Sequence, residues 1–181
     1  MSPRLRARVL ARALRDNART MTQSPDPLRT QLAWLLDWEE AHVGFDKATS
    51  GIAADKYGAQ AQGFEHSPWQ LLEHIRIAQK DILDFCVSPT YAHDLSWPDD
   101  YWPTDPVPPG ATTWNDTIAS YKADRESLRQ VALDARADLL APVPTGDANQ
   151  TVLRGILLAA SHTAYHLGQL VAVRRALRIW T

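Results

Sequence analysis

The sequence contains very little cysteine and no long uncharged apolar segment, and each absence excludes a class of protein. Cys86 is the one cysteine among 181 residues, so an internal disulfide is impossible and a reducing compartment such as the cytoplasm is expected. No run of about 18 or more apolar residues is free of charge, so we expect no membrane span. The N-terminal residues carry frequent arginines and no apolar core segment, which argues against a secretory signal.

Net charge is also small, and it is unevenly distributed. The formal charge of −2 gives no reason to expect nucleic acid or an anionic membrane as a partner. Residues 1–22, however, hold six arginines and a single acid, Asp16. We therefore expect 1–22 to be a basic, flexible extension and 23–181 to be one domain, long enough to bury a core. Two other interpretations of the extension are an organelle transit peptide, or a translation start at Met21 that leaves residues 1–20 dispensable or disordered.

The clearest helix start in the chain lies at residues 67–70. Ser67 can cap, Pro68 suits the first helical position, and Gln70 completes a capping box. Apolar residues at helical spacing then continue to about Val87, and Pro89 follows. Similar signals predict the other helices, over 27–40 after Asp26 as N-cap, 44–50, 114–136 after Thr113 as cap, and from 149 or 151 to 178. No strand pattern is present, so these ranges predict an all-α helix bundle.

A long segment rich in proline and aromatic residues separates the helix over 68–87 from the next main helix. Residues 88–112 hold six of the twelve prolines, together with Trp97, Tyr101 and Trp102. Loops of this length in a small domain are usually functional or cover another part of the molecule. The three aromatic side chains are candidates for an apolar wall over a site, although packing of the loop on the bundle would account for them equally well.

Two histidines one helical turn apart mark the last helix. His162 and His166 are four residues apart, which places them about 40° apart on one helical face. Their neighbours on that face are apolar, and a buried imidazole needs a partner. One interpretation is a pair of hydrogen-bonded core histidines, and the other is a metal clamp. The zinc-protease helix motif is not present, because Thr163 stands where that motif needs glutamate.

A third histidine stands on another apolar helical face. His74 lies at the edge of the buried arc predicted for residues 68–87. Three neutral imidazoles are a common ligand set for zinc, and they also suit nickel, copper or iron. Three protein ligands leave a position for water or substrate, as in catalytic sites, and the metal lowers the pKa of bound water. On spacing alone, three satisfied core histidines remain the competing interpretation.

From about residue 26 onward the chain resembles the DinB-like superfamily of bacterial helical bundles. The resemblance rests on 66–79 (HSPWQLLEHIRIAQ) with Asp81, on 97–103 (WPDDYWP) and on 162–169 (HTAYHLGQ). It implies an up-up-down-down four-helix bundle that frequently forms homodimers. It also implies that His74, His162 and His166 together bind one divalent ion, with zinc or nickel favoured and iron, manganese or copper as further options.

The resemblance does not supply a reaction. Some members of the superfamily look like metal-dependent hydrolases. Others resemble transferases or isomerases that use a low-molecular-weight thiol such as mycothiol, bacillithiol or glutathione. We therefore expect a metal-binding, cytoplasmic homodimer that is either a metal-dependent hydrolase or a thiol S-transferase. The alternative is a non-catalytic binding or stress-response module that keeps the three histidines for stability or ligand sensing.

Two further polar residues are candidates for a role at the histidines. Asp81 lies seven residues after His74, about 20° from it on the helix, where it could act as a base or hold a ligand imidazole. For Asp81 we favour a structural hydrogen bond or ion pair over these roles. Gln169 is placed to orient a water or ligand, with an interhelix hydrogen bond as the alternative.

The remaining candidates are expected to be structural. Tyr165 is expected to pack rather than react, His66 and His93 to be loop residues, and Cys86 to be a small buried apolar residue.

Overall fold

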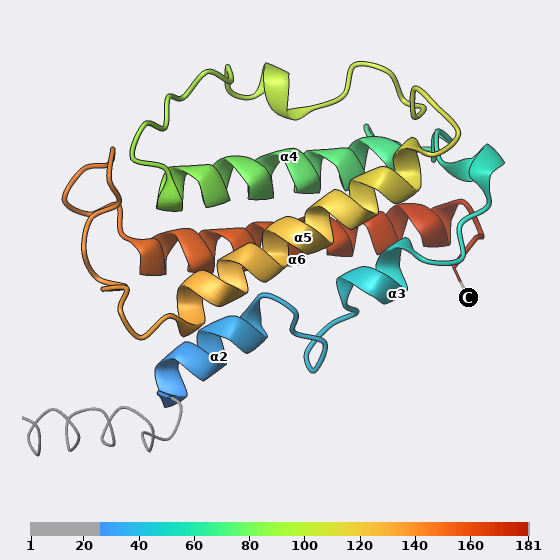
Figure 1. Ribbon diagram of the computed structural model, residues 1–181. Helices are drawn as coiled ribbons and strands as arrows, with labels where there is room; N and C mark the ends of the chain where they lie inside the picture. The colour runs from blue at the N-terminus through green and yellow to red at the C-terminus, as the bar shows by residue number, and fades with distance from the viewer. Residues whose placement is uncertain (1–25, 181) are drawn as a thin grey trace, which may run out of the picture.

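The computed structural model describes residues 26–180, and in this range it contains five α-helices and no strand (Figure 1). The helices are α2 (Pro27–Leu35), α3 (Phe45–Thr49), α4 (Pro68–Val87), α5 (Thr113–Leu133) and α6 (Val152–Ala176), with short 3₁₀ helices η1 (Ala54–Lys56) and η2 (Asp99–Tyr101). The all-α prediction is confirmed. The predicted extension 1–22, and with it the start at Met21, lies outside the described residues.

Two of the long helices begin as the sequence predicts. Ser67 accepts a hydrogen bond from the backbone N–H of Gln70, and the Gln70 side chain accepts one from the backbone N–H of Ser67, so the capping box is complete. Thr151 caps α6 by accepting from the N–H of Arg154. For α5 the cap is Thr112, so the prediction of Thr113 was wrong by one residue.

The end predicted for the first helix was wrong, because α2 stops at Leu35 and not at Glu40. Asp37, Glu39 and Glu40 follow, and carboxylates near a helix C-terminus oppose the helix dipole. Asp37 instead pairs with Arg125 of α5. The helix is therefore short, and the segment that follows it runs irregularly along the bundle.

The relative directions of the helices differ from the expected up-up-down-down order. Contacts 73–117 and 79–121 show that α4 and α5 are parallel, whereas contacts 29–132 and 33–129 show that α2 and α5 are antiparallel. Helix α6 runs opposite to α4, since His162 and His166 lie by His74 while Gly155 lies by Cys86. The observed order is thus up-down-down-up.

Parallel packing of α4 and α5 requires a return along the whole helix. A 20-residue helix is about 30 Å long, and residues 88–112 are long enough to span it. Figure 1 shows this loop running back over α4 from the end of that helix to the start of α5. This return path explains why residues 88–112 form such a long loop.

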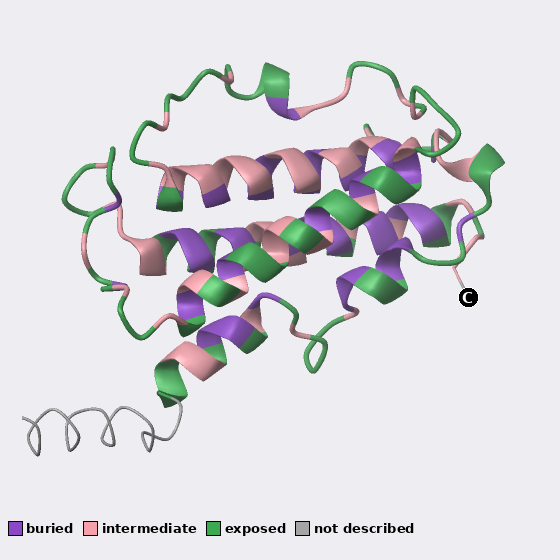
Figure 2. Ribbon diagram, in the orientation of Figure 1, coloured by how far each residue is buried: buried purple, intermediate pink, exposed green. Residues whose placement is uncertain are grey.

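Buried residues line the inner faces of the helices (Figure 2). One cluster contains Leu72, Ile75 and Leu170 with aromatic residues of α3 and α5, and a second contains Leu32, Leu128 and Ile156. Among residues 26–180, α6 is the one helix long and apolar enough to cross a membrane by length and composition. It contacts α2, α3, α4 and α5, so packing within the bundle accounts for part of its apolar character, while Leu157, Leu158 and Tyr165 are exposed.

A buried arginine joins the end of α6 to α3. Arg174 is 1% exposed, and its guanidinium donates to the carbonyl oxygens of Lys47, Ala48 and Ile179. Its charged group also lies 4.6 Å from the centre of the Trp180 ring, a favourable cation–π contact. The residues after α6 therefore belong to the folded core.

Candidate metal centre

The structure brings His74 of α4 together with His162 and His166 of α6. The Nε2 atom of His74 lies 3.0 Å from Nε2 of His162 and 3.1 Å from Nε2 of His166. One ligand atom from each residue falls within 4.8 Å of the other two, with no carboxylate or cysteine in the group. His74 and His166 are buried and His162 is half-buried, so solvent is nearest to His162.

Close approach of α4 and α6 is possible because Gly155 has no side chain. A Cβ atom at position 155 would lie 2.2 Å from Sγ of Cys86 on α4, far inside van der Waals contact. Cys86 is itself buried, as expected, and burial raises the pKa of its thiol to about 11. It therefore packs as a neutral apolar side chain between the two helices.

The other ring nitrogens of two histidines are held by hydrogen bonds. Nδ1 of His74 donates to the backbone carbonyl of Tyr101 at 2.8 Å, and a carbonyl can only accept. Nδ1 of His166 donates to Oε1 of Gln169 at 2.7 Å. In the neutral form both imidazoles therefore present a bare Nε2 lone pair, and their 3.1 Å contact joins two acceptors with no proton between them.

All three imidazoles are held in the neutral form. Burial is the main cause, and it lowers the pKa of His74 to about 4 and that of His162 to about 3. Burial also lowers the pKa of His166, against the opposing effect of its hydrogen bond with Gln169. Three neutral nitrogens within 4.8 Å of one another are a donor set that suits a divalent ion, so the side chains present fit such an ion.

Trp102 of the long loop covers the His74 ring. The indole and imidazole are parallel to within 3°, with centroids 3.7 Å apart, and His66 stacks on the same indole at 3.8 Å. The edge of His166 also approaches Trp102. The expected apolar wall is thus formed by Trp102 itself, whereas Trp97 is 68% exposed and packs at the edge of Tyr101.

Asp81 acts on the loop and not directly on a histidine. Its carboxylate accepts hydrogen bonds from the hydroxyls of Tyr91 at 2.7 Å and Tyr101 at 2.6 Å. Burial and this carboxylate raise the pKa of both tyrosines, so both hydroxyls stay protonated. Tyr101 in turn offers its carbonyl to His74. Asp81 therefore makes the structural hydrogen bonds expected of it, and it reaches His74 only through Tyr101.

The outer residues of the site have simpler surroundings. Gln169 donates through Nε2 to the hydroxyl of Tyr165, which is 64% exposed, so its hydrogen bonds lie within α6 and not between helices. His93 lies in the loop, with Nδ1 2.8 Å from the Tyr91 hydroxyl.

A cavity of about 700 Å³ lies between α4 and this loop, and Asp81, Tyr91 and Asp100 are among the residues that line it.

Two contributors could not be identified from spacing. The Tyr101 carbonyl is a backbone group, so no residue type indicates it, and it reaches His74 only because the loop returns over α4. His66 lies one residue before the cap of α4, and its stacking on Trp102 could not be predicted from that position.

Comparison with known families agrees with this arrangement. The family model described as the DinB superfamily matches residues 37–170, a range that includes all three histidines and the long loop. No curated protein and no solved structure matches the chain. The match covers well over half of the 181 residues, so the chain belongs to the DinB superfamily.

Proposed function

We propose that the protein binds one divalent metal ion through the Nε2 atoms of His74, His162 and His166 and uses it in catalysis. The observation that carries this proposal is the 3.1 Å contact between Nε2 of His74 and Nε2 of His166. Two lone pairs at this distance repel each other, and a cation between them removes the repulsion. Nitrogens bound to a tetrahedral zinc ion lie about 3.4 Å apart, close to the 3.0 and 3.1 Å measured here.

The chain's own residues support this role by fixing the ligands. The Tyr101 carbonyl and the Gln169 amide each hold an Nδ1–H, which sets the tautomer and orientation of His74 and His166. Trp102 excludes water from one face of His74. Three neutral imidazoles leave a bound divalent ion its full charge, so that it lowers the pKa of a water or thiol that binds to it.

Two reactions use this chemistry. In hydrolysis, water supplies hydroxide to the acyl carbon and a proton to the leaving group. In thiol transfer, the sulfur forms a bond to an electrophilic carbon, the leaving group departs with its electron pair, and the thiol proton goes to solvent. The group of three histidines contains no carboxylate to serve as a base, and Asp81 is occupied by two tyrosines. A thiol needs less help from a base than water does, so we favour thiol transfer.

The first test is metal content. Protein purified without a metal-affinity tag should carry about one divalent ion per chain by elemental analysis. His162→Ala should lose most of it, and His162→Gln, which keeps more of the side-chain volume, should lose it too. His93→Ala is the matched control, since His93 is an exposed loop histidine outside the group. Equal metal in all four proteins, or none even when zinc and nickel are supplied, would contradict the proposal.

The second test separates the reactions. Metal-loaded protein is assayed with glutathione and 1-chloro-2,4-dinitrobenzene for transfer, and with 4-nitrophenyl acetate for hydrolysis, beside His162→Gln. Transfer that disappears in the variant supports our preferred reaction, and hydrolysis that disappears supports the other. Tight metal binding with activity in neither assay favours the non-catalytic module, for which the covering of His74 by Trp102 is the relevant observation.

The homodimer and the cytoplasmic location are part of the same proposal. The homodimer rests on the family resemblance, and the location rests on the single cysteine, Cys86. Light scattering after size exclusion tests the dimer, with about 40 kDa expected from two chains of 20.2 kDa. A single 20 kDa species at micromolar concentration would remove the dimer from the proposal without affecting the metal site.

A further inference from the structure

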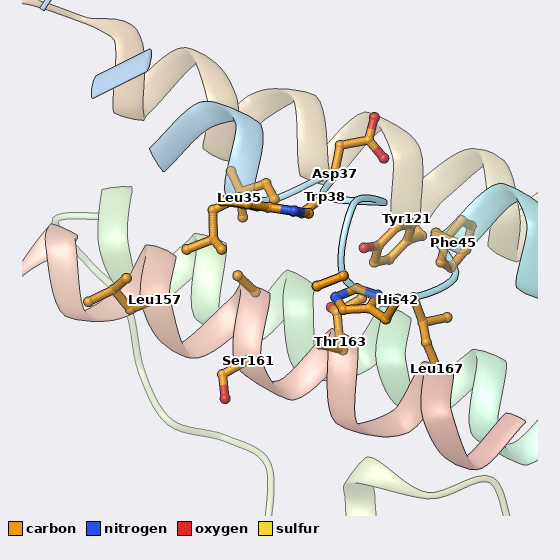
Figure 3. Close-up of a pocket in the computed structure, with 14 residues that line it drawn as sticks. Leu35, Asp37, Trp38, His42, Phe45, Tyr121, Leu157, Ser161, Thr163 and Leu167 are labelled. Atoms are coloured by element: carbon orange, nitrogen blue, oxygen red, sulfur yellow. The ribbon is translucent and has the colours of Figure 1, made fainter. Parts of the chain in front are cut away.

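A second cavity lies on a different face of α6 from the three histidines. It has a volume of about 490 Å³ and lies among α5, α6 and the segment that follows α2. Figure 3 shows Trp38, His42, Tyr121 and Thr163 around this space. The residues of α6 that line it, such as Thr163, Leu167 and Ala164, are about 80°, 120° and 180° around the helix from the mean direction of the two histidines. The cavity is therefore separate from the candidate metal centre.

One side of the cavity is formed by the segment that follows α2, because α2 ends at Leu35 and not at Glu40. The irregular segment that follows contributes Trp38 and His42 to the rim and walls. The cavity opens to solvent, and its volume of about 490 Å³ lies within the range of small-molecule pockets.

One buried donor in the wall has no partner. The indole Nε1–H of Trp38 is shielded from solvent and makes no hydrogen bond within residues 26–180. In Figure 3 this nitrogen is at the edge of the indole that faces Tyr121 and His42. A buried donor without an acceptor costs about 1–3 kcal/mol. Because this nitrogen has no surface open to the cavity as the side chain stands, a turn of the half-buried indole toward the cavity would bring its N–H to an acceptor oxygen of a bound molecule and relieve that cost.

The charges at the cavity favour a neutral occupant. The carboxylate of Asp37 lines the cavity and pairs with Arg125, and no lysine or arginine is among the described residues that line it. An anion would therefore meet Asp37 without a lysine or arginine in the cavity wall to bind it. The rest of the wall is mainly apolar or aromatic, including Phe45, Leu157 and Leu167. Such a wall suits a flat aromatic or alicyclic body.

We propose that this cavity binds a small, neutral, largely aromatic molecule whose carbonyl or ether oxygen accepts a hydrogen bond from Nε1–H of Trp38. The site goes beyond the metal function and does not depend on it. The N–H of Trp38 would select molecules that carry an acceptor oxygen, and the apolar walls formed by α5 and α6 would select molecules by shape.

The test uses a pair of probes that differ only in the acceptor. 2-Acetylnaphthalene carries a carbonyl, and 2-ethylnaphthalene has nearly the same shape without it. The full chain, labelled with ¹⁵N, should show indole N–H signals from its seven tryptophans, and Trp38→Phe assigns the one from Trp38. We expect the ketone to move the Trp38 signal downfield with a dissociation constant on the order of 0.1–1 mM, and to bind about fivefold more tightly than the hydrocarbon.

Two variants locate the binding. Trp38→Phe keeps an aromatic ring but removes the donor, so it should abolish the preference for the ketone. Ala164→Phe fills the cavity and should abolish binding of both probes. Leu158→Phe is the matched control, because Leu158 is on α6, exposed, and does not line this cavity. If Ala164→Phe fails to fold, Trp38→Phe with the two probes decides alone.

All titrations are run with and without added zinc, so failure of the metal proposal and failure of this one are distinguishable. Binding abolished by His162→Gln would place the probes at the histidines and overturn the inference. So would equal binding of both probes by wild type, or an unmoved Trp38 signal. A Trp38 signal that depends on protein concentration but not on the probes would assign the surface to a contact between copies of the chain, which also overturns it.

Discussion

The Nδ1 atom of His166 lies 2.7 Å from the side-chain oxygen of Gln169, three residues further along the same helix. This bond fixes both the tautomer and the rotation of the imidazole, because an oxygen acceptor requires the proton on Nδ1. Because His166 and Gln169 lie on the same helix, Gln169 holds the His166 ring without help from the long loop or from α4.

Replacing Gln169 by leucine should weaken metal binding by about 10–100-fold, the usual cost of losing such a partner. Competition with a chromophoric chelator measures the affinity. Tyr165→Phe is the control, since it removes only the hydroxyl that receives the Gln169 amide. Unchanged affinity in Gln169→Leu would mean that His166 needs no partner to hold its orientation.

Asp81→Asn should loosen the long loop. The change removes the charge that accepts from Tyr91 and Tyr101, and hydrogen bonds to charged groups contribute about 1.5–3 kcal/mol each. We expect the free energy of unfolding in urea to fall by about 2 kcal/mol, with faster amide exchange in residues 88–112. Asp84→Asn, which breaks an exposed pair with Lys80, should change stability by less than about 1 kcal/mol. Equal effects of the two changes would contradict the role of Asp81 in holding residues 88–112 through the hydroxyls of Tyr91 and Tyr101.

Stability of the metal-free protein should fall as pH decreases from about 6.5 to about 4. In the unfolded chain histidine binds a proton near its ordinary pKa of about 6.5, whereas burial lowers the pKa of His74 to about 4 and of His162 to about 3. The unfolded state then binds more protons than the folded state, so acid favours unfolding. Stability from these groups is fully present above about pH 6.5 and is lost toward pH 4.

Urea unfolding at pH 7.5 and 5.0 in the presence of a chelator measures this loss. His162→Gln should show a smaller difference between the two pH values than wild type, and His93→Gln should behave like wild type. An identical difference in all three proteins would show that other groups cause the acid sensitivity.

Alanine at the two glycines of α6 should have opposite effects. Gly155→Ala introduces a Cβ 2.2 Å from Sγ of Cys86 and should destabilise the protein by about 1–3 kcal/mol. Gly168 is exposed, with nothing within 4 Å of a built Cβ, so Gly168→Ala should stabilise it by up to about 1 kcal/mol through helix propensity. Thermal unfolding measures both. Recovery of stability in Gly155→Ala combined with Cys86→Ala would confirm that the sulfur is the obstacle.

Local signals in the sequence predicted the parts of the fold that depend on neighbours along the chain. The capping box at 67–70 and the cap at Thr151 set the starts of α4 and α6. The spacing of His162 and His166 predicted a shared face, and the apolar arc of 68–87 placed His74 near the core. Family resemblance then joined the three residues, which periodicity alone could not do.

The errors arose where distant residues decide. Helix α2 ends earlier than predicted, and Asp37 just after it pairs with Arg125, a residue 88 positions away. The direction of α5 depends on the loop returning over α4, and composition shows only that a long loop exists. The structural hydrogen bond expected for Asp81 is present, but the two tyrosines that donate to it lie in that loop. The partners of Asp81 could therefore not be predicted from the sequence of α4 alone.

Arg174 also bears on how the chain can be shortened. The family match ends at residue 170, and a fragment cut at that boundary would lack both Arg174 and Trp180. A fragment cut at Ala176 would keep the buried guanidinium of Arg174 but remove the Ile179 carbonyl and the Trp180 ring that contact it. A buried cation stripped of partners is costly. The smallest fragment that folds well should therefore extend through Trp180, ten residues past the boundary of sequence similarity.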